Sequence, residues 1–214
     1  MKQLFAPTLA VMVLAAGAVI LSGGFVFAPA RAASQNSSQT VSVTVNTGIT
    51  LTLASSTLPI ANLTPGTPVY ATTSASVTTN NSTGWNLGLQ HVNSTTTTLL
   101  SGSITYPDYA PSWDNAANGN SGNAATAPGA VLSFRTYQTG TDAALFSSTW
   151  WGASDAPGTA KWGGTATTSK AIANVASYVG TTQSVVYGFR ADAPGTQQSG
   201  AYSGGITLTA LTNP

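Results

Sequence analysis

Residues 41–53, VSVTVNTGITLTL, contain two runs in which apolar and hydroxyl-bearing side chains alternate. Valine alternates with serine or threonine over residues 41–45, and isoleucine or leucine alternates with threonine over residues 49–53. A period of two puts the apolar side chains on one face of a strand and the hydroxyls on the other. The stretch therefore predicts two half-buried β-strands, with a bend or tight turn at residues 46–48 between them.

Similar strand signals recur along the whole chain. Further strands are predicted at residues 69–79, 84–90, 103–106, 130–137, 183–190 and 202–211. Pairs such as Pro-Gly and Asn-Asn separate these runs and are typical of turns. Many short strands with such turns predict an all-β protein, an antiparallel immunoglobulin-like β-sandwich. The segment 170–179 is the best candidate for a helix, and it is short.

Two features bear on how the chain is divided. The five residues GITLT occur at 48–52 and again at 205–209, and matching strands at both ends suit one domain that begins and finishes in one core. Two irregular stretches, 107–128 and 140–164, are rich in glycine and predict long loops inserted in the sandwich. We therefore expect a single β-sandwich domain over residues 33–214.

The first 32 residues have the pattern of an export signal. A basic residue, Lys2, precedes a long apolar run, and Ala30 and Ala32 fit an A-x-A cleavage site. The pattern predicts cleavage after Ala32, with an uncleaved membrane anchor as the alternative. In both cases the remaining chain is expected outside the cytoplasm, secreted or on a bacterial cell surface.

Charge and cysteine content exclude several classes of function. Only 5% of the residues are charged, compared with about 25% in ordinary soluble domains. Because phosphate binding requires clustered Lys and Arg, the chain is a poor candidate for a nucleic-acid partner. The low charge instead favours self-association. Without cysteine, the chain has neither disulfides nor thiolate metal sites.

The residues needed for catalysis are sparse. The single histidine, His91, has no motif of a nucleophilic triad around it. The five carboxylates are expected to cap local turns: Asp108, Asp114, Asp142, Asp155 and Asp192. The loop 114–120 resembles a calcium loop weakly, since it lacks the ordered acidic pattern. We expect no enzyme, no cofactor and no metal site.

Four tryptophans lie in the predicted loops: Trp113, Trp150, Trp151 and Trp162. Exposed aromatic rings stack on sugars, so these residues suggest a carbohydrate-binding face. The alternative is that long loops need apolar anchors, with one ring of the 150–151 pair pointing in and the other out.

Two segments resemble a known family. Residues 79–87, TNNSTGWNL, place Trp85 and Leu87 after an Asn/Gly turn, and residues 199–211, SGAYSGGITLTAL, place Tyr202 before a final strand. Both are similar to the WxL-type surface domains of Gram-positive bacteria. The last strand has LTA at 208–210 where the family has its second Trp-x-Leu.

The resemblance implies an exported, non-catalytic protein that associates with the cell wall or a surface layer. Its partners would be cell-wall polysaccharide, peptidoglycan or other surface proteins. Two alternatives remain open: a carbohydrate-binding module that uses the loop tryptophans, and a self-assembling pilus-like or fibre-like subunit joined through strand edges.

Overall fold

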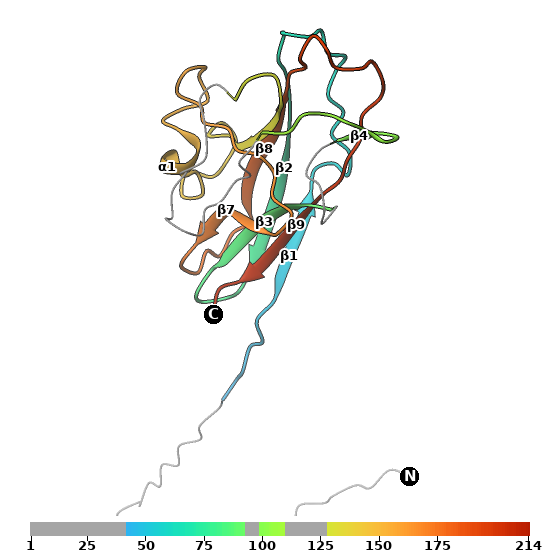
Figure 1. The fold of residues 1–214 in the computed structure, drawn as a ribbon. Coiled ribbons are helices and arrows are strands. Elements are labelled where there is room, and N and C mark those ends of the chain that lie inside the picture. Colours follow the sequence, from blue (N-terminus) through green and yellow to red (C-terminus); the bar gives the residue numbers. More distant parts are fainter. Residues whose placement is uncertain (1–41, 93–98, 110–127) are drawn as a thin grey trace, which may run out of the picture. The chain divides into compact units, whose positions relative to one another are not determined.

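The alternating segments form nine β-strands and one short helix in the residues that the computed structural model describes, 42–92, 99–109 and 128–214 (Figure 1). The elements are β1 (Ile49–Leu53), β2 (Val69–Thr79), β3 (Trp85–His91), β4 (Leu100–Ser101), β5 (Ile104–Thr105), β6 (Leu132–Thr136), α1 (Ser148–Trp151), β7 (Lys170–Val175), β8 (Gln183–Ala191) and β9 (Ile206–Thr212). Residues 44–214 form one compact unit.

The strands pair antiparallel throughout these described residues, which confirms the predicted all-β, antiparallel class. A four-stranded sheet has the order β1-β2-β8-β6, and a three-stranded sheet has the order β7-β3-β9. The short strands β4 and β5 form a separate hairpin. Almost all the pairings in the two larger sheets join strands that are distant in the sequence, so their register is set by tertiary packing.

Both larger sheets contribute side chains to a shared core. Its largest fully buried apolar side chains are Val77, Trp85, Leu87, Leu89, Phe134, Trp151, Ile172 and Val185. Burial of a side chain of this size contributes about 1.5–3 kcal/mol before the entropy of ordering the chain is subtracted. The alternation seen in the sequence therefore indicates the inside face of strands such as β1 and β2, whereas β6 is buried on both faces.

The turn before β3 depends on a glycine. Gly84 has a φ angle of 82°, in the left-handed region that residues with a Cβ rarely adopt. A Cβ at this position would also collide with the backbone carbonyl of Val175. Gly84 thus allows the chain to turn tightly into β3 while lying against the end of β7.

The helix considered for residues 170–179 is wrong, because Lys170–Val175 is strand β7. It pairs with β3, and its Ile172 and Ala173 are 0% and 1% exposed in the core. Hydrogen bonding to the edge of β3 and burial of these side chains outweigh the weak local preference for a helix.

The N-terminal end of the compact unit also differs from the sequence-based expectation. Residues 42–48 have no regular secondary structure, so no strand forms at 42–45 and no turn at 46–48. Residues 44–48 instead continue from β1 away from the sheets (Figure 1). The predicted signal peptide at 1–32 and most of the loop at 107–128 lie outside the described residues.

The stretch 140–164 is largely irregular, as predicted, but contains the short helix α1. The Ser147 side chain caps α1 by accepting a hydrogen bond of 3.3 Å from the N–H of Trp150. No helix in the described part of the chain is long and apolar enough to cross a membrane.

Candidate functional site

The tryptophans predicted to contact a ligand are largely inside the protein. Trp151 is 0% exposed and packs edge-on against Phe134, with 5.4 Å between ring centroids. Trp162 is 6% exposed, and Trp150 is partly buried against the core. Trp113 lies outside the described residues. These positions match the anchoring alternative for Trp151, and sugar binding by the four residues stays a prediction without a supporting contact.

The residues that carry the family resemblance are also structural. Trp85 is 1% exposed, and its Nε1–H donates a hydrogen bond of 3.0 Å to Oε1 of the buried Gln183. Leu87 is 0% exposed. The Tyr202 hydroxyl donates to the Gln198 carbonyl at 2.6 Å, and its ring packs against Tyr106. Trp85 and Leu87 belong to the core, and Tyr202 packs against it.

The two segments that resemble WxL-type domains lie side by side in the structure. β3 and β9 are hydrogen-bonded neighbours, with Leu87 opposite Ala210 and Leu89 opposite Leu208. Although the segments are about 120 residues apart in the sequence, they form one antiparallel pair. The last strand thus presents Leu208 and Ala210 beside the tryptophan motif of β3.

Hydrogen bonds from asparagine side chains connect the ends of this strand pair. Nδ2 of Asn81 donates to the carbonyls of Gly84 and Asn213 at 2.7 and 2.9 Å. Nδ2 of Asn213 donates in turn to the Val175 carbonyl at 2.7 Å. The Asn/Gly turn therefore holds β3, β7 and β9 together, which is a structural reason for the polar residues that precede the Trp-x-Leu motif.

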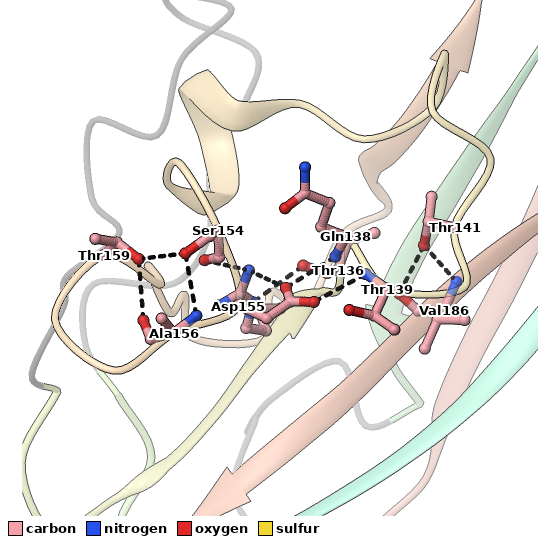
Figure 2. Close-up of polar contacts among 10 residues, drawn as sticks. Thr136, Gln138, Thr139, Thr141, Ser154, Asp155, Ala156, Thr159 and Val186 are labelled. Atoms are coloured by element: carbon pink, nitrogen blue, oxygen red, sulfur yellow. Dashed lines mark hydrogen bonds and ion pairs between the residues drawn. The ribbon is translucent and has the colours of Figure 1, made fainter.

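A buried ion pair fastens the 140–164 loop to the four-stranded sheet. Nη2 of Arg135 lies 2.8 Å from Oδ1 of Asp155, and the Arg135 side chain is fully buried. The same carboxylate accepts the backbone N–H groups of Gln138 and Thr139, each at 2.8 Å (Figure 2). Asp155 therefore bridges the strand, the chain that follows it and its own loop.

Aromatic rings complete the surroundings of Arg135. Its Cζ lies 5.0 Å from the ring centroid of Tyr137 and 5.6 Å from that of Trp162, within the range of cation–π attraction. Nη1 has no hydrogen-bond partner in the described structure, and the two rings give the guanidinium further favourable contacts. The Trp162 ring therefore packs beside the ion pair and forms part of its surroundings.

The environment shifts the pKa values in this cluster. Burial lowers the pKa of Arg135, against the opposing effect of Asp155. Burial by itself would raise the pKa of Asp155, but the N–H groups of Gln138 and Thr139 and the Arg135 charge lower it below its usual value. Burial raises the pKa of Tyr137 to about 12, so its hydroxyl stays neutral. The cluster is an ionised pair at neutral pH.

Acid is expected to weaken the fold through Asp155. The carboxyl pKa is lower in the folded chain than its unfolded value of about 3.9. The stabilisation by this group is therefore complete above the unfolded pKa and is lost as the pH falls through the folded pKa. Urea unfolding from about pH 5 down to about pH 2 should show a steeper loss of stability in the parent chain than in Asp155→Asn. Equal slopes would contradict this role.

The other described carboxylates also hold backbone in place, but only Asp108 does so locally, by accepting the N–H of Tyr109, as a turn cap would. Asp142 Oδ2 accepts the Ser184 N–H at 2.7 Å, and Asp192 Oδ1 accepts the Gly66 N–H at 3.1 Å. His91 is 4% exposed at the end of β3. Within residues 42–92, 99–109 and 128–214, no cluster of three or more His, Asp or Glu side chains could hold a metal ion.

The feature that sequence reasoning missed is the incomplete burial of apolar side chains along β1 and β9, edge strands of the two larger sheets that lie close to each other. Leu51 is opposite Val77, and Ala210 is opposite Leu87, so these residues face the core. Val77 and Leu87 are 0% exposed, whereas Leu53 of β1 is 42% exposed. The remaining inward-facing apolar residues of β1 and β9 are only partly buried: Ile49, Leu51, Ile206, Leu208 and Ala210.

A cavity of about 560 Å³ lies beside the end of β1, and residues 55–60, which follow β1, line part of it. The four-stranded sheet lines it with Thr73, Tyr187 and Phe189. The three-stranded sheet lines it with Ile206 and Leu208. Serine and threonine side chains and His91 also line it, so the surface of the cavity is partly polar.

No protein-family model matches this sequence, and no curated protein matches it. The likeness to WxL-type domains therefore rests on the residues of β3 and β9 and on the turns that lead into them.

Proposed function

We propose that this chain is an exported, non-catalytic bacterial surface protein that associates non-covalently with the cell wall or surface layer, as WxL-type domains do. The observation that carries the proposal is the pairing of β3 with β9, because it joins the two segments of the resemblance into one strand pair. The export pattern of residues 1–32 supports a location outside the cytoplasm.

The proposal includes an immunoglobulin-like β-sandwich as the framework. Four strands in one sheet and three in the other, with a common core, are what such a sandwich requires. In this framework Leu208 and Ala210 take the place of the family's second Trp-x-Leu. Both are smaller than tryptophan, and both are only partly buried. Leu208 and Ala210 would thus keep the inward-facing positions of the family's last strand, but they fill less volume than a tryptophan would.

Attachment to the wall would depend on hydrogen bonds and apolar contacts. With 5% charged residues and a formal net charge of +1, the protein has little electrostatic attraction for a charged polymer. Serine, threonine and asparagine side chains offer donors and acceptors to sugar hydroxyls and peptide groups. Binding to peptidoglycan or wall polysaccharide should therefore depend only weakly on salt.

Co-sedimentation tests this function. Residues 33–214, purified and folded, are mixed with intact Gram-positive cell walls and, separately, with purified peptidoglycan. We expect the protein to pellet with the walls at both low and high salt. A sample that has been unfolded by heat and cooled is the control for nonspecific trapping. Recovery of the folded protein entirely in the supernatant with both materials would contradict the proposal.

A further inference from the structure

Three segments that are distant in the sequence meet toward the end of the compact unit opposite the C-terminus (Figure 1). They are residues 54–66, residues 99–106 and residues 192–205. Leu100 and Ser203 exchange two backbone hydrogen bonds, of 2.8 and 2.9 Å. The Gly66 N–H donates to the Ala193 carbonyl at 3.1 Å. These bonds connect the segments to one another, so the loops hold each other in place.

The three segments line a second cavity, of about 530 Å³. Ile60, Leu99 and Tyr202 also line the cavity of about 560 Å³ beside β1, so the two cavities are neighbours. The lining of the second cavity includes side-chain amides and hydroxyls beside aromatic rings: Asn62, Tyr106, Gln197, Gln198, Ser199 and Tyr202. Cavities of roughly 300–1,000 Å³ with a few polar groups of this kind are typical of small-molecule sites.

Hydrogen bonds fix the polar part of this lining. Nε2 of Gln197 donates to the Thr105 carbonyl at 3.1 Å and to the Tyr202 hydroxyl at 2.7 Å. The Tyr202 hydroxyl donates in turn to the Gln198 carbonyl at 2.6 Å, and its ring lies edge-on to that of Tyr106. Because both amide hydrogens of Gln197 are used in this way, the group that it can offer to a ligand is the acceptor Oε1.

The hydroxyl of Tyr106 is the group that points to a ligand. Tyr106 is 2% exposed, and its hydroxyl has no hydrogen-bond partner within the described residues. Leaving a buried group unpaired costs about 1–3 kcal/mol, and nearly all buried polar groups in proteins are paired. Burial raises the pKa of Tyr106 to about 12, so the hydroxyl keeps its proton and can donate it. An acceptor bound in the cavity that Tyr106 lines would complete this hydrogen bond.

The charge around the cavity disfavours an ionic ligand. None of the described residues that line it is charged. The charged neighbours in the sequence, Arg190 and Asp192, are paired with each other at 3.3 Å, and Asp192 also accepts the Gly66 N–H at 3.1 Å. An ion would lose its hydration here without gaining a counter-charge. A sugar suits the cavity better, because its hydroxyls both donate and accept while its C–H groups pack against aromatic rings.

We propose that this cavity binds an uncharged sugar unit. The Tyr106 hydroxyl donates to a sugar oxygen, Oε1 of Gln197 accepts from a sugar hydroxyl, and the Tyr202 ring contacts the C–H groups. Binding at this cavity rests on the function proposed above, because wall polysaccharide or peptidoglycan is the source of the sugar. The residues differ from the loop tryptophans, since they come from the segments around β4, β5 and the start of β9.

Titration calorimetry with four uncharged tetrasaccharides tests the site: cellotetraose, maltotetraose, mannotetraose and the tetramer of N-acetylglucosamine. We expect residues 33–214 to bind at least one of them. Tyr106→Phe keeps the ring and removes the hydroxyl, so it should bind the same sugar about tenfold more weakly, the effect of one lost hydrogen bond.

Tyr137→Phe is the matched control. The Tyr137 hydroxyl also has no hydrogen-bond partner in the described part of the chain, but Tyr137 lies against Arg135 and lines neither cavity. This variant should bind the sugar as the parent does. Neither variant should have a lower melting temperature than the parent, because each removes a buried hydroxyl that forms no hydrogen bond.

Two further variants locate the sugar. Ala201 is exposed and lines the cavity, so the ring in Ala201→Trp should fill the space and abolish binding. Circular dichroism and thermal melting check that this variant stays folded. Trp150→Ala removes a loop tryptophan that is only partly buried, and it should leave binding unchanged. Loss of binding in Trp150→Ala with full binding in Ala201→Trp would place the sugar on the 140–164 loop and reject the cavity.

Three other results would overturn the inference. None of the four tetrasaccharides could bind, or Tyr106→Phe could bind as tightly as the parent. A lower melting temperature of Tyr106→Phe would show that the hydroxyl has a partner within its own chain. If the parent and Ala201→Trp pellet equally with cell walls and no tetrasaccharide binds, the proposed function stands and this inference is rejected. If a tetrasaccharide binds in the cavity but the parent stays in the supernatant with walls, the sugar site stands and attachment to the wall is rejected.

Discussion

Replacing Trp85 with alanine is expected to lower the free energy of unfolding by about 3–5 kcal/mol. The side chain is 1% exposed at the start of β3, between the turn at Gly84 and the buried Leu87. Its removal takes away apolar contacts and leaves a cavity in a core that is packed from both larger sheets. It also leaves Oε1 of Gln183, a residue only 5% exposed, without its indole donor. Equilibrium unfolding in urea measures the effect.

Two further variants separate volume from hydrogen bonding. Trp85→Phe keeps most of the apolar volume but removes the N–H, so it should cost about 1–3 kcal/mol. Tyr178→Ala removes an aromatic ring that is 57% exposed, and its effect should stay within about 0.5 kcal/mol. If Trp85→Ala cost no more than Tyr178→Ala, the assignment of Trp85 to the core would be wrong.

The Asp155→Asn variant is expected to lose about 3 kcal/mol of stability, the lower end of the range for breaking a buried ion pair. Arg135 would keep its charge with 0% side-chain exposure and no carboxylate beside it. The asparagine amide would also direct a donor at one of the two N–H groups that the carboxylate accepts, those of Gln138 and Thr139. The value is at the lower end because the Asp155 side chain is 22% exposed and water can relax around it.

A double variant distinguishes a charge effect from a general loss of packing. In Arg135→Met/Asp155→Asn the uncompensated cation is gone, so part of the lost stability should return. Asp142→Asn is the matched control, because Asp142 accepts a backbone N–H from Ser184 but has no ion pair in the described structure. It should cost less than about 1 kcal/mol. A double variant no more stable than Asp155→Asn would show that the charge is not the cause.

The strands were predictable because their signal is local. Alternation in residues 49–53, 69–79 and 183–190 corresponds closely to β1, β2 and β8. Where a segment lacked alternation, prediction failed: residues 170–175 are a strand because β3 offers a hydrogen-bonding edge and the core accepts Ile172. Residues 42–45 alternate well and yet form no strand, since no described strand lies beside them to complete the hydrogen bonds.

The candidate sites were predictable only in part. Asp155 was expected to cap a turn, and it does accept backbone N–H groups, but its pairing with Arg135 spans 20 residues. The sequence left open whether the loop tryptophans contact a ligand or anchor the loop, and it could not decide that Trp151 and Trp162 are buried, because burial depends on how the loop lies against β6. The closeness of β1 to β9 had one indirect signal, the repeated GITLT at 48–52 and 205–209, which marks two terminal strands.

The amino-acid sequence by itself determined the all-β class, the inward face of most strands, the scarcity of charge and the export pattern, because each depends on composition or on neighbours a few residues apart. Only the tertiary structure decided that β3 lies beside β9, that Arg135 is buried on Asp155, and that β1 lies close to β9 while Val45 stays exposed to water. The physical reason is that strand order, loop docking and edge pairing depend on contacts between distant segments, whose free energy no local pattern contains.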